Sequence, residues 1–223
     1  MEAQNLLNFP YLTKLSSHSA LIAGIDEAGR GCLAGPVVAA AVILNPARPI
    51  AGLADSKSLS PSKREKLSIS IKNDALAWGL GLSWQKRIDE INILQASFEA
   101  MAKAVAVLKI RPNHLLIDGP FCIPAVHLAK KACSSISQTA IIRGDQSEAS
   151  ISAASILAKC YRDQLMYVFS RKWPNYSFAQ HKGYGTKAHL QALAKYGPCP
   201  LHRLSFRKVR PEKQAGRQLL IGI

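Results

Sequence analysis

The sequence lacks the patterns that mark secreted, zinc-binding and membrane-spanning proteins. No C-x-x-C pair occurs and the number of cysteines is odd, which argues against a disulfide framework and against a zinc site. Residues 1–19 lack a basic segment followed by an apolar one, so no signal peptide is expected. No apolar run approaches the length of a membrane span. We therefore expect a cytoplasmic protein with reduced thiols, namely Cys32, Cys122, Cys133, Cys160 and Cys199.

Acidic residues are also scarce. The chain has 14 Asp and Glu residues against 29 Lys and Arg residues, which gives a formal net charge of +15. Solubility alone does not require so large a charge, so a polyanionic partner such as nucleic acid is favoured. The alternative is a basic protein without such a partner. Hydrophobic residues make up 48% of the chain, which argues against disorder.

Apolar, β-branched runs alternate with helical patterns along the chain. Strands are expected at residues 21–25, 37–44, 75–82, 114–120 and 138–142, with the first two forming an antiparallel hairpin. Helices are expected at residues 60–73, 91–108, about 154–168 and 187–196, and residues 173–185 are expected to form a loop. This alternation predicts an α/β domain with a mixed, mostly buried sheet. We divide the chain into an extension (1–19), a catalytic core (20–172) and a C-terminal helical and basic segment packed on the core (173–223).

Acidic side chains stand where three of the predicted strands end. Asp26 and Glu27 end the first run, Asp118 ends the fourth and Asp145 follows the fifth. Ligands of open α/β sheets bind at strand ends, so the four carboxylates are expected to converge. Close carboxylates repel one another, and two divalent cations would remove that repulsion. The pattern therefore favours a two-metal site of the kind that nucleases use.

Each acid also has a plainer interpretation. Taken alone, any of them could be a helix N-cap or a solvated residue at a strand end. Asp145 is the most open to this interpretation, because it stands just before a predicted helix. The repetition of strand end, acid and glycine at separate places in the chain favours the metal site.

Several motifs together resemble one known family. The stretch GIDEAGRG at 24–31, followed by LAGPV at 33–37, resembles the N-terminal signature of bacterial ribonuclease HII, a type 2 ribonuclease H. The segments DSK (55–57), IDG (117–119), SAASILAK (152–159), HKGYGT (181–186) and HR (202–203) resemble its later motifs, in order. One departure is Cys32, which stands where the family usually has proline.

The resemblance covers about residues 20–209 and implies a ribonuclease H-like fold. That fold is a mixed five-stranded sheet flanked by helices, with a C-terminal helical appendage. The implied activity is hydrolysis of the RNA strand of RNA–DNA hybrids and incision at single ribonucleotides in duplex DNA. It implies two divalent cations per site, Mn²⁺ or Mg²⁺, and products with 5′-phosphate and 3′-OH ends. It also implies a monomer, with a possible sliding-clamp contact through a terminus.

The resemblance also assigns roles to individual residues. The catalytic and metal-binding residues would be Asp26, Glu27, Asp118 and Asp145. Backbone groups of Gly29, Arg30 and Gly31 would contact the ribonucleotide near its 2′-OH, the group that distinguishes RNA from DNA. Tyr184 would complete this recognition, and Lys57 would meet a phosphate near the scissile bond.

Other residues keep two interpretations. Lys57 could be an ordinary surface lysine, and Tyr184 a packed tyrosine with a satisfied hydroxyl. His181 and His189 are expected to be structural or phosphate-contacting, because imidazole suits Mg²⁺ or Mn²⁺ poorly. An internal ion pair is expected between Arg162 and Asp163. The basic C-terminal residues Lys182, Lys187, Arg203, Arg207, Lys208 and Arg210 are expected to neutralise phosphates.

Two other functions fit these residues less well. A DNA-directed nuclease of the same fold fits the Gly-Arg-Gly stretch and Tyr184 less well, because these suit a ribose-reading pocket. A non-catalytic hybrid-binding protein would not need an acid cluster facing phosphates.

Overall fold

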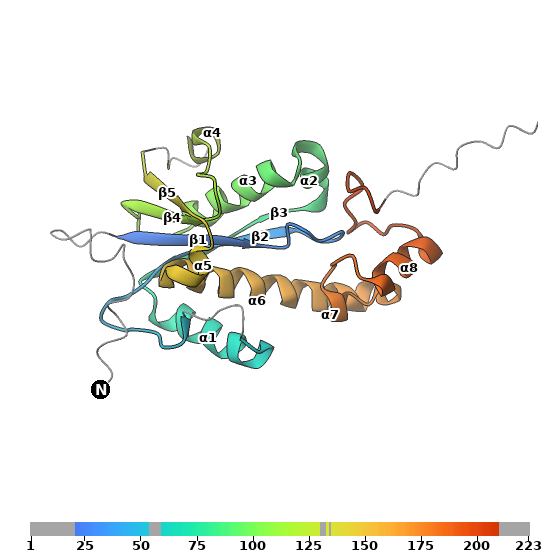
Figure 1. Ribbon diagram of the computed structural model, residues 1–223, viewed down its shortest axis with the longest axis horizontal. Helices are drawn as coiled ribbons and strands as arrows, with labels where there is room; N and C mark the ends of the chain where they lie inside the picture. The colour runs from blue at the N-terminus through green and yellow to red at the C-terminus, as the bar shows by residue number, and fades with distance from the viewer. Residues whose placement is uncertain (1–20, 54–58, 130–132, 134, 210–223) are drawn as a thin grey trace, which may run out of the picture.

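The computed structural model describes residues 21–53, 59–129, 133 and 135–209. Its centre is one mixed sheet of five strands in the order β3-β2-β1-β4-β5 (Figure 1). The strands are β1 (Ile22–Ala28), β2 (Val37–Ile43), β3 (Ala77–Ser83), β4 (His114–Asp118) and β5 (Ser137–Ile141). β1 pairs with β2 antiparallel and with β4 parallel. The predicted mixed five-stranded sheet and its opening hairpin are confirmed.

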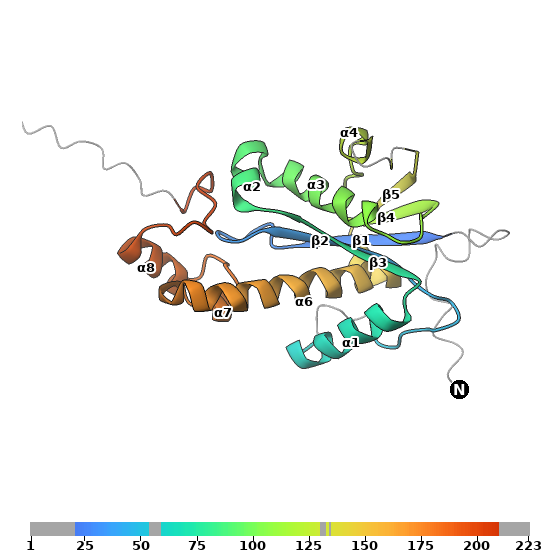
Figure 2. The same ribbon diagram turned by 180° about the vertical axis from the view of Figure 1, so that it is seen from behind.

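Both faces of the sheet are covered by helices (Figures 1 and 2). One face lies against α2 (Gln85–Ile91), α3 (Ile93–Ala106) and α4 (Ala125–Ala129), and the other against α1 (Pro61–Asp74) and α6 (Ala149–Lys172). Alternate residues of β2 belong to different cores: Val37 and Ala39 to the first, Val38 and Ala40 to the second. This period of two explains why β2 is an unbroken apolar run in the sequence.

Two helices follow closely from their sequence signals. α1 begins after the N-cap Ser60, whose hydroxyl accepts a hydrogen bond from the Lys63 N–H, with proline at the first position. α8 (Lys187–Tyr196) begins after Thr186, which caps it in the same way. The predicted single helix at 91–108 is wrong in one respect, because Asn92 has a positive φ of 66° and separates α2 from α3.

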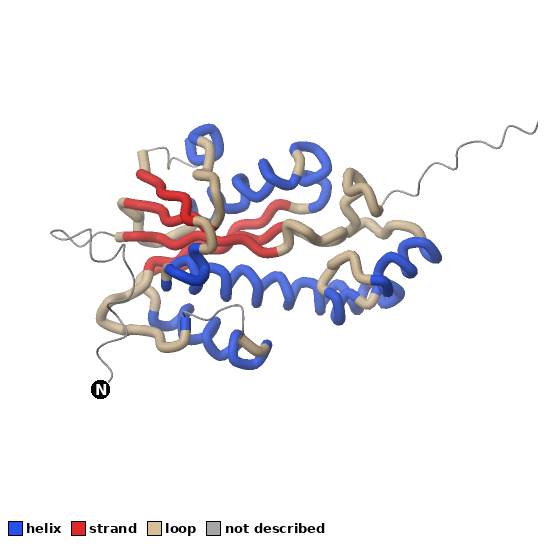
Figure 3. The backbone as a smooth tube through the Cα atoms, viewed as in Figure 1, coloured by secondary structure: helices blue, strands red, loops and turns tan. Residues whose placement is uncertain are grey.

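The chain beyond α6 is more helical than its composition suggests. The predicted loop at 173–185 contains the 3₁₀ helix η3 (Pro174–Tyr176) and the short α7 (Phe178–His181). With α8 they form a third apolar cluster around Phe178, Tyr176 and Met166. Figure 3 shows the tan loop between β1 and β2 beside loops of this C-terminal part, and the Leu33 N–H donates to the Gly183 carbonyl at 2.8 Å.

Glycine lets α6 lie directly on β1. A Cβ atom added at Gly24 would collide with backbone atoms of Ser150 and Ile151, at the first turn of α6. The close approach places the start of this helix over the strand that carries Asp26. Among the helices of the described ranges, none is both long and apolar enough to cross a membrane.

Candidate active site

The register of the parallel strands brings two of the predicted acids together. Ile25 of β1 is paired with Ile117 of β4, so Asp26 and Asp118 are the next residues on adjacent strands. Leu116 packs with Ile151 of α6, so alternation places the Asp118 side chain on the α6 face. Asp26 lies on the same face, where the Ser155 hydroxyl of α6 hydrogen-bonds its carboxylate.

Asp145 joins this pair through its backbone. It lies in the short helix α5 (Gly144–Ser147), three residues beyond the expected strand, and is 2% exposed. Its N–H donates to the Asp118 carboxylate at 3.4 Å. Glu27 follows Asp26, and its carboxylate accepts a hydrogen bond from Arg30 at 3.2 Å. We call the group of Asp26, Glu27, Asp118 and Asp145 the acid edge.

Electrostatics within the acid edge favour a bound cation. Burial raises the pKa of Asp26 well above its ordinary value of 3.8, and the charges of Glu27 and Asp118 raise it further. Burial also raises the pKa of Glu27, with Asp118 adding to the rise and Arg30 opposing it. Ionised oxygens in such a cluster are costly unless a cation compensates them. The donor set, carboxylate oxygen only, is the type that Mg²⁺ and Mn²⁺ prefer.

The side chains of the acid edge do not form a complete metal-binding arrangement in this structure. Across the described ranges, no group of three or more His, Cys, Asp or Glu side chains has an arrangement that could hold a metal ion. The structure therefore gathers the acids at one end of the parallel strands, and their role as ligands stays a prediction.

The loop between β1 and β2 presents two free backbone donors beside the acids. We call residues 29–36 the glycine loop. Within the described residues, no hydrogen bond is found from the N–H of Arg30 or of Gly31, and both residues are exposed. The carbonyls of Gly29 and Arg30 are bonded on the buried side, to Arg203. Because a trans peptide points its N–H opposite to its C=O, the two amides face outward.

Tyr184 lies against this loop. Its side chain is 44% exposed and interacts with the thiol of Cys32, the residue that follows Gly31. Burial raises the pKa of the Tyr184 hydroxyl above 10 and that of the Cys32 thiol above 9. The loop is thus bordered by the Arg30–Glu27 ion pair on the acid side and by an exposed aromatic ring on the other.

Two arginines have roles that the sequence did not suggest. Arg203 was expected at a phosphate, but it is fully buried and bonds carbonyls of the glycine loop. Arg162 was expected to pair with Asp163, but it too is buried, and its guanidinium donates to the carbonyls of Ala34, Pro36 and Lys182. Asp163 pairs instead with Lys159 at 2.6 Å. No residue pattern marks an arginine as buried when backbone carbonyls are its partners.

A chain of buried histidines holds the backbone at Tyr184, which agrees with the structural role expected for His189. The Tyr184 carbonyl can only accept, so His189 carries its proton on Nδ1 and donates it to that carbonyl at 2.9 Å. The His189 Nε2 therefore accepts from His202 Nε2 at 3.0 Å, and His202 Nδ1 accepts from the Cys199 N–H. Burial lowers the pKa of His202 to about 4 and also lowers that of His189. His181 stacks on His189.

The other residues predicted to contact phosphates lie partly outside the described residues and partly on the surface. Lys57 lies outside the described residues, as does Arg210. Lys187, Arg207 and Lys208 are exposed and free to meet phosphates.

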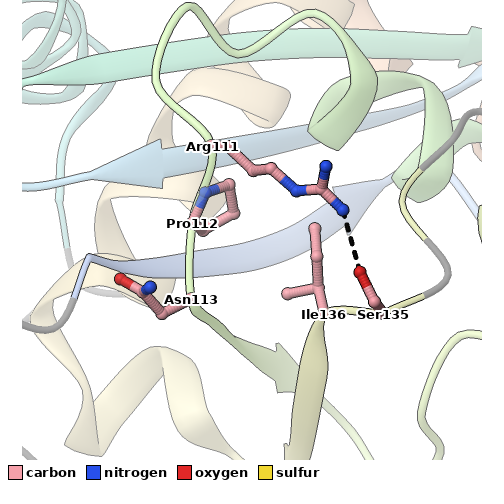
Figure 4. A pocket seen from close by; sticks show the side chains of 5 residues that line it. All are labelled: Arg111, Pro112, Asn113, Ser135 and Ile136. Atoms are coloured by element: carbon pink, nitrogen blue, oxygen red, sulfur yellow. Dashed lines mark hydrogen bonds between the residues drawn. The ribbon is translucent and has the colours of Figure 1, made fainter.

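The hollow drawn in Figure 4 is separate from the acid edge. It has a volume of about 380 Å³ and is lined by Arg111, Pro112, Asn113, Ser135 and Ile136. Arg111 donates to the Ser135 hydroxyl at 2.9 Å across it. These residues precede β4 and β5, whereas Asp118 ends β4. The hollow therefore lies at the opposite end of the strands from the acids.

Comparison with known proteins gives concordant matches. Residues 23–209 match the family model described as Ribonuclease HII. A curated Ribonuclease HII from Nitratidesulfovibrio vulgaris is 53% identical over 203 residues, covering 90% of this chain and 92% of that protein. A Ribonuclease HII from Acinetobacter baylyi is also 53% identical, over 85% of this chain and 96% of its own.

Solved structures share the fold. The crystal structure of ribonuclease H2 from Pyrococcus horikoshii superposes with a TM-score of 0.71 at 27% identity, covering 85% of this chain and 95% of that one. The structure of a PCNA:RNase HII complex from Archaeoglobus fulgidus gives a TM-score of 0.70 at 24% identity, covering 88% of this chain and 98% of that one.

Proposed function

Because the chain belongs to the ribonuclease HII family of metal-dependent ribonucleases H, which act on RNA–DNA hybrids, we propose that its acid edge cuts the strand whose ribose the glycine loop reads. The proposal includes incision at a single ribonucleotide within duplex DNA. The main support for the proposal is that the paired acids lie next to the free backbone amides of the glycine loop. Asp26 and Asp118 stand side by side on parallel strands, and the outward-facing amides of Arg30 and Gly31 follow four and five residues after Asp26.

The acid edge would hold the metal. Asp26, Glu27, Asp118 and Asp145 would supply carboxylate oxygens to two divalent cations, Mg²⁺ or Mn²⁺. When bound, such cations supply charge stabilisation at the attacking and leaving oxygens of phosphodiester hydrolysis. The chain's own residues fix the ligands: the Ser155 hydroxyl and the Glu27 N–H bond the Asp26 carboxylate, and the Asp145 N–H bonds that of Asp118.

The glycine loop and Tyr184 would select the substrate. The free amides of Arg30 and Gly31 can donate to a ribose 2′-OH or to a phosphate oxygen, and no atom lies within 4 Å of the Cβ position of Gly31. The half-exposed ring of Tyr184 can stack on the sugar or base that follows. A deoxyribose lacks the 2′-OH, and the site would then leave a donor unpaired.

Three further assignments complete the proposal. Lys57 would contact a phosphate near the scissile bond. The C-terminal segment from residue 173, with exposed Lys187, Arg207 and Lys208, would form an appendage that faces the duplex. The enzyme would act as a monomer, and a terminus would contact a sliding clamp.

A set of matched duplexes tests the proposal. One strand carries a single ribonucleotide, four ribonucleotides or none, and each duplex is incubated with EDTA, Mg²⁺ or Mn²⁺. We expect cleavage only with metal and ribonucleotide together, at the ribonucleotide, with 5′-phosphate and 3′-OH ends. Cleavage of the all-DNA duplex would favour a DNA-directed nuclease of this fold. Binding without cleavage under every condition would favour a hybrid-binding protein.

A further inference from the structure

Two fully buried arginines lie beneath the glycine loop, and neither forms a salt bridge with a described residue. Arg162 is 1% exposed and Arg203 is 0% exposed. Burying a guanidinium is costly unless its donors are satisfied, and burial lowers the pKa of Arg203 to about 10. Their donors are therefore committed to backbone carbonyls, which ties their position to the course of the loop.

The donors of Arg203 converge on the part of the loop that presents the free amides. Its Nη2 donates to the Gly29 carbonyl at 2.8 Å and to the Gly35 carbonyl at 2.9 Å. Its Nη1 donates to the Arg30 carbonyl at 2.8 Å, and its Nε to the Gly35 carbonyl at 3.0 Å. One planar fork thus closes the loop by joining its first and last turns.

These bonds set the direction of the free amides. The peptide that carries the Gly29 carbonyl also carries the Arg30 N–H, and the peptide with the Arg30 carbonyl carries the Gly31 N–H. Holding both carbonyls inward therefore holds both N–H groups outward. Besides its bond to Arg203, the Gly29 carbonyl accepts a longer bond from the Cys32 N–H at 3.3 Å. Gly29 has a φ of 98°, which a glycine adopts freely, so this peptide would be held more weakly without Arg203.

We propose that Arg203 is a positioning residue for substrate selection: it orients the Arg30 and Gly31 amides toward the ribose without touching the substrate. This inference rests on the ribose-reading role proposed for those amides. Lysine cannot replace this function, because its single ammonium cannot reach three carbonyls with a fixed fork.

Arg162 supplies a matched control. It is equally buried, and its donors go to the carbonyls of Ala34 and Pro36, at the far end of the glycine loop, and of Lys182, while its side chain packs against Gly29 without a hydrogen bond to the Gly29 or Arg30 carbonyl. Arg162→Lys and Arg203→Lys therefore make the same chemical change at similar depth.

Asp89 supplies a milder variant that is less prone to misfold. Its carboxylate accepts hydrogen bonds from the Leu204 N–H at 3.0 Å and from the Ser205 N–H at 2.8 Å, next to Arg203. Asp89→Asn should weaken the hydrogen bonds that hold the backbone next to Arg203, while the Arg203 guanidinium can still bond all of its carbonyl partners.

The experiment measures Kd in EDTA for a duplex with one ribonucleotide and for the same duplex in DNA. We expect Arg203→Lys to lower the ribonucleotide preference about tenfold, the scale of one charge-assisted hydrogen bond, with affinity for DNA retained. Asp89→Asn should lower it less, and so should Arg162→Lys, which loosens the far end of the loop but leaves the Gly29 and Arg30 carbonyls bonded to Arg203. Equal loss of preference in Arg203→Lys and Arg162→Lys, or no loss in Arg203→Lys and Asp89→Asn, would overturn the proposal.

Hydrogen exchange of the peptide that covers residues 29–36 separates this inference from the proposed function. Arg203→Lys should raise exchange there more than Arg162→Lys does. If wild-type protein showed no ribonucleotide preference, the ribose-reading function would fail, and unchanged exchange in Arg203→Lys would in addition refute the positioning role.

Discussion

At the scale of single residues, the candidate site gathers carboxylates that are costly to ionise together. Asp26 is buried, its pKa is raised well above 3.8, and Asp118 adjoins it on the next strand. The convergence of the acids could be predicted because each stands at or just after the end of an apolar run of the sequence with a glycine close by, although β1 itself continues past Asp26 to Ala28. The hydrogen bond from Ser155 to Asp26 could not be predicted from the sequence, because it depends on the packing of α6 on β1.

Asp118→Asn should lower kcat/KM at least about 100-fold, because even supporting residues of metal sites cost up to that much. Substrate binding should survive, since the basic surface is unchanged. Asp74→Asn makes the same change at a surface ion pair with Arg48 and should leave turnover intact. Substantial turnover in Asp118→Asn would refute the assigned role.

Tyr184→Ala should lower incision at a lone ribonucleotide about tenfold, the cost of one aromatic stacking contact. The matched control is Tyr167→Ala, because Tyr167 is also exposed and lies on α6, outside the proposed site. Rates are measured on the single-ribonucleotide duplex under single-turnover conditions. Equal rates for Tyr184→Ala and the wild type would remove Tyr184 from substrate recognition.

At the scale of elements, the sequence predicted the strands and the capped helices well. Their signals are local: unbroken apolar runs in β1 and β2, and a capping residue before α1 and α8. The break at Asn92 has a local signal that the periodicity hides, because its side chain caps α3 by accepting from the Gln95 N–H. The short helices within 173–185 lack such a signal, and their packing in the third apolar cluster decides them. The buried position of Arg203 could not be predicted from local sequence either, because its partners are carbonyls more than 160 residues away.

Gly24→Ala tests the contact between β1 and α6. The added methyl collides with helix backbone rather than with a flexible side chain, so we expect a loss of about 3 kcal/mol in the free energy of unfolding. Gly52→Ala adds a methyl where no atom lies within 4 Å and should cost about 1 kcal/mol, from its positive φ alone. Urea titration measures both, and equal losses would contradict the close packing.

At the scale of the whole molecule, two properties follow from charge and burial. The net charge of +15 gives a sequence-independent attraction to the nucleic-acid backbone. The buried pair of His189 and His202 couples the stability of the C-terminal part to pH.

Binding to duplex should weaken at least about 100-fold between 50 and 200 mM salt, because phosphate contacts release counterions and this release is less favourable at higher salt. The measurement is a titration of Kd against salt on the all-DNA duplex, where ribose reading does not contribute. A flat dependence would show that the basic surface does not carry the affinity.

Stability should fall as the pH drops below 6.5. The folded pKa of His202 is about 4, against an ordinary value of 6.5, so between these values the unfolded chain binds a proton that the folded chain does not. At pH 5 this should cost about 1 to 2 kcal/mol relative to pH 7.5. His202→Gln should lack this part of the slope, and identical pH slopes would contradict the assignment.

The most direct test of the account is one cleavage reaction in H₂¹⁸O with Mg²⁺, on a duplex with a single ribonucleotide and on its all-DNA twin. If the acid edge activates water at a site that reads ribose, the cut lies at the ribonucleotide, the 5′-phosphate carries one ¹⁸O, and the DNA twin stays intact. A 2′,3′-cyclic phosphate without ¹⁸O, or equal cutting of both duplexes, would contradict it.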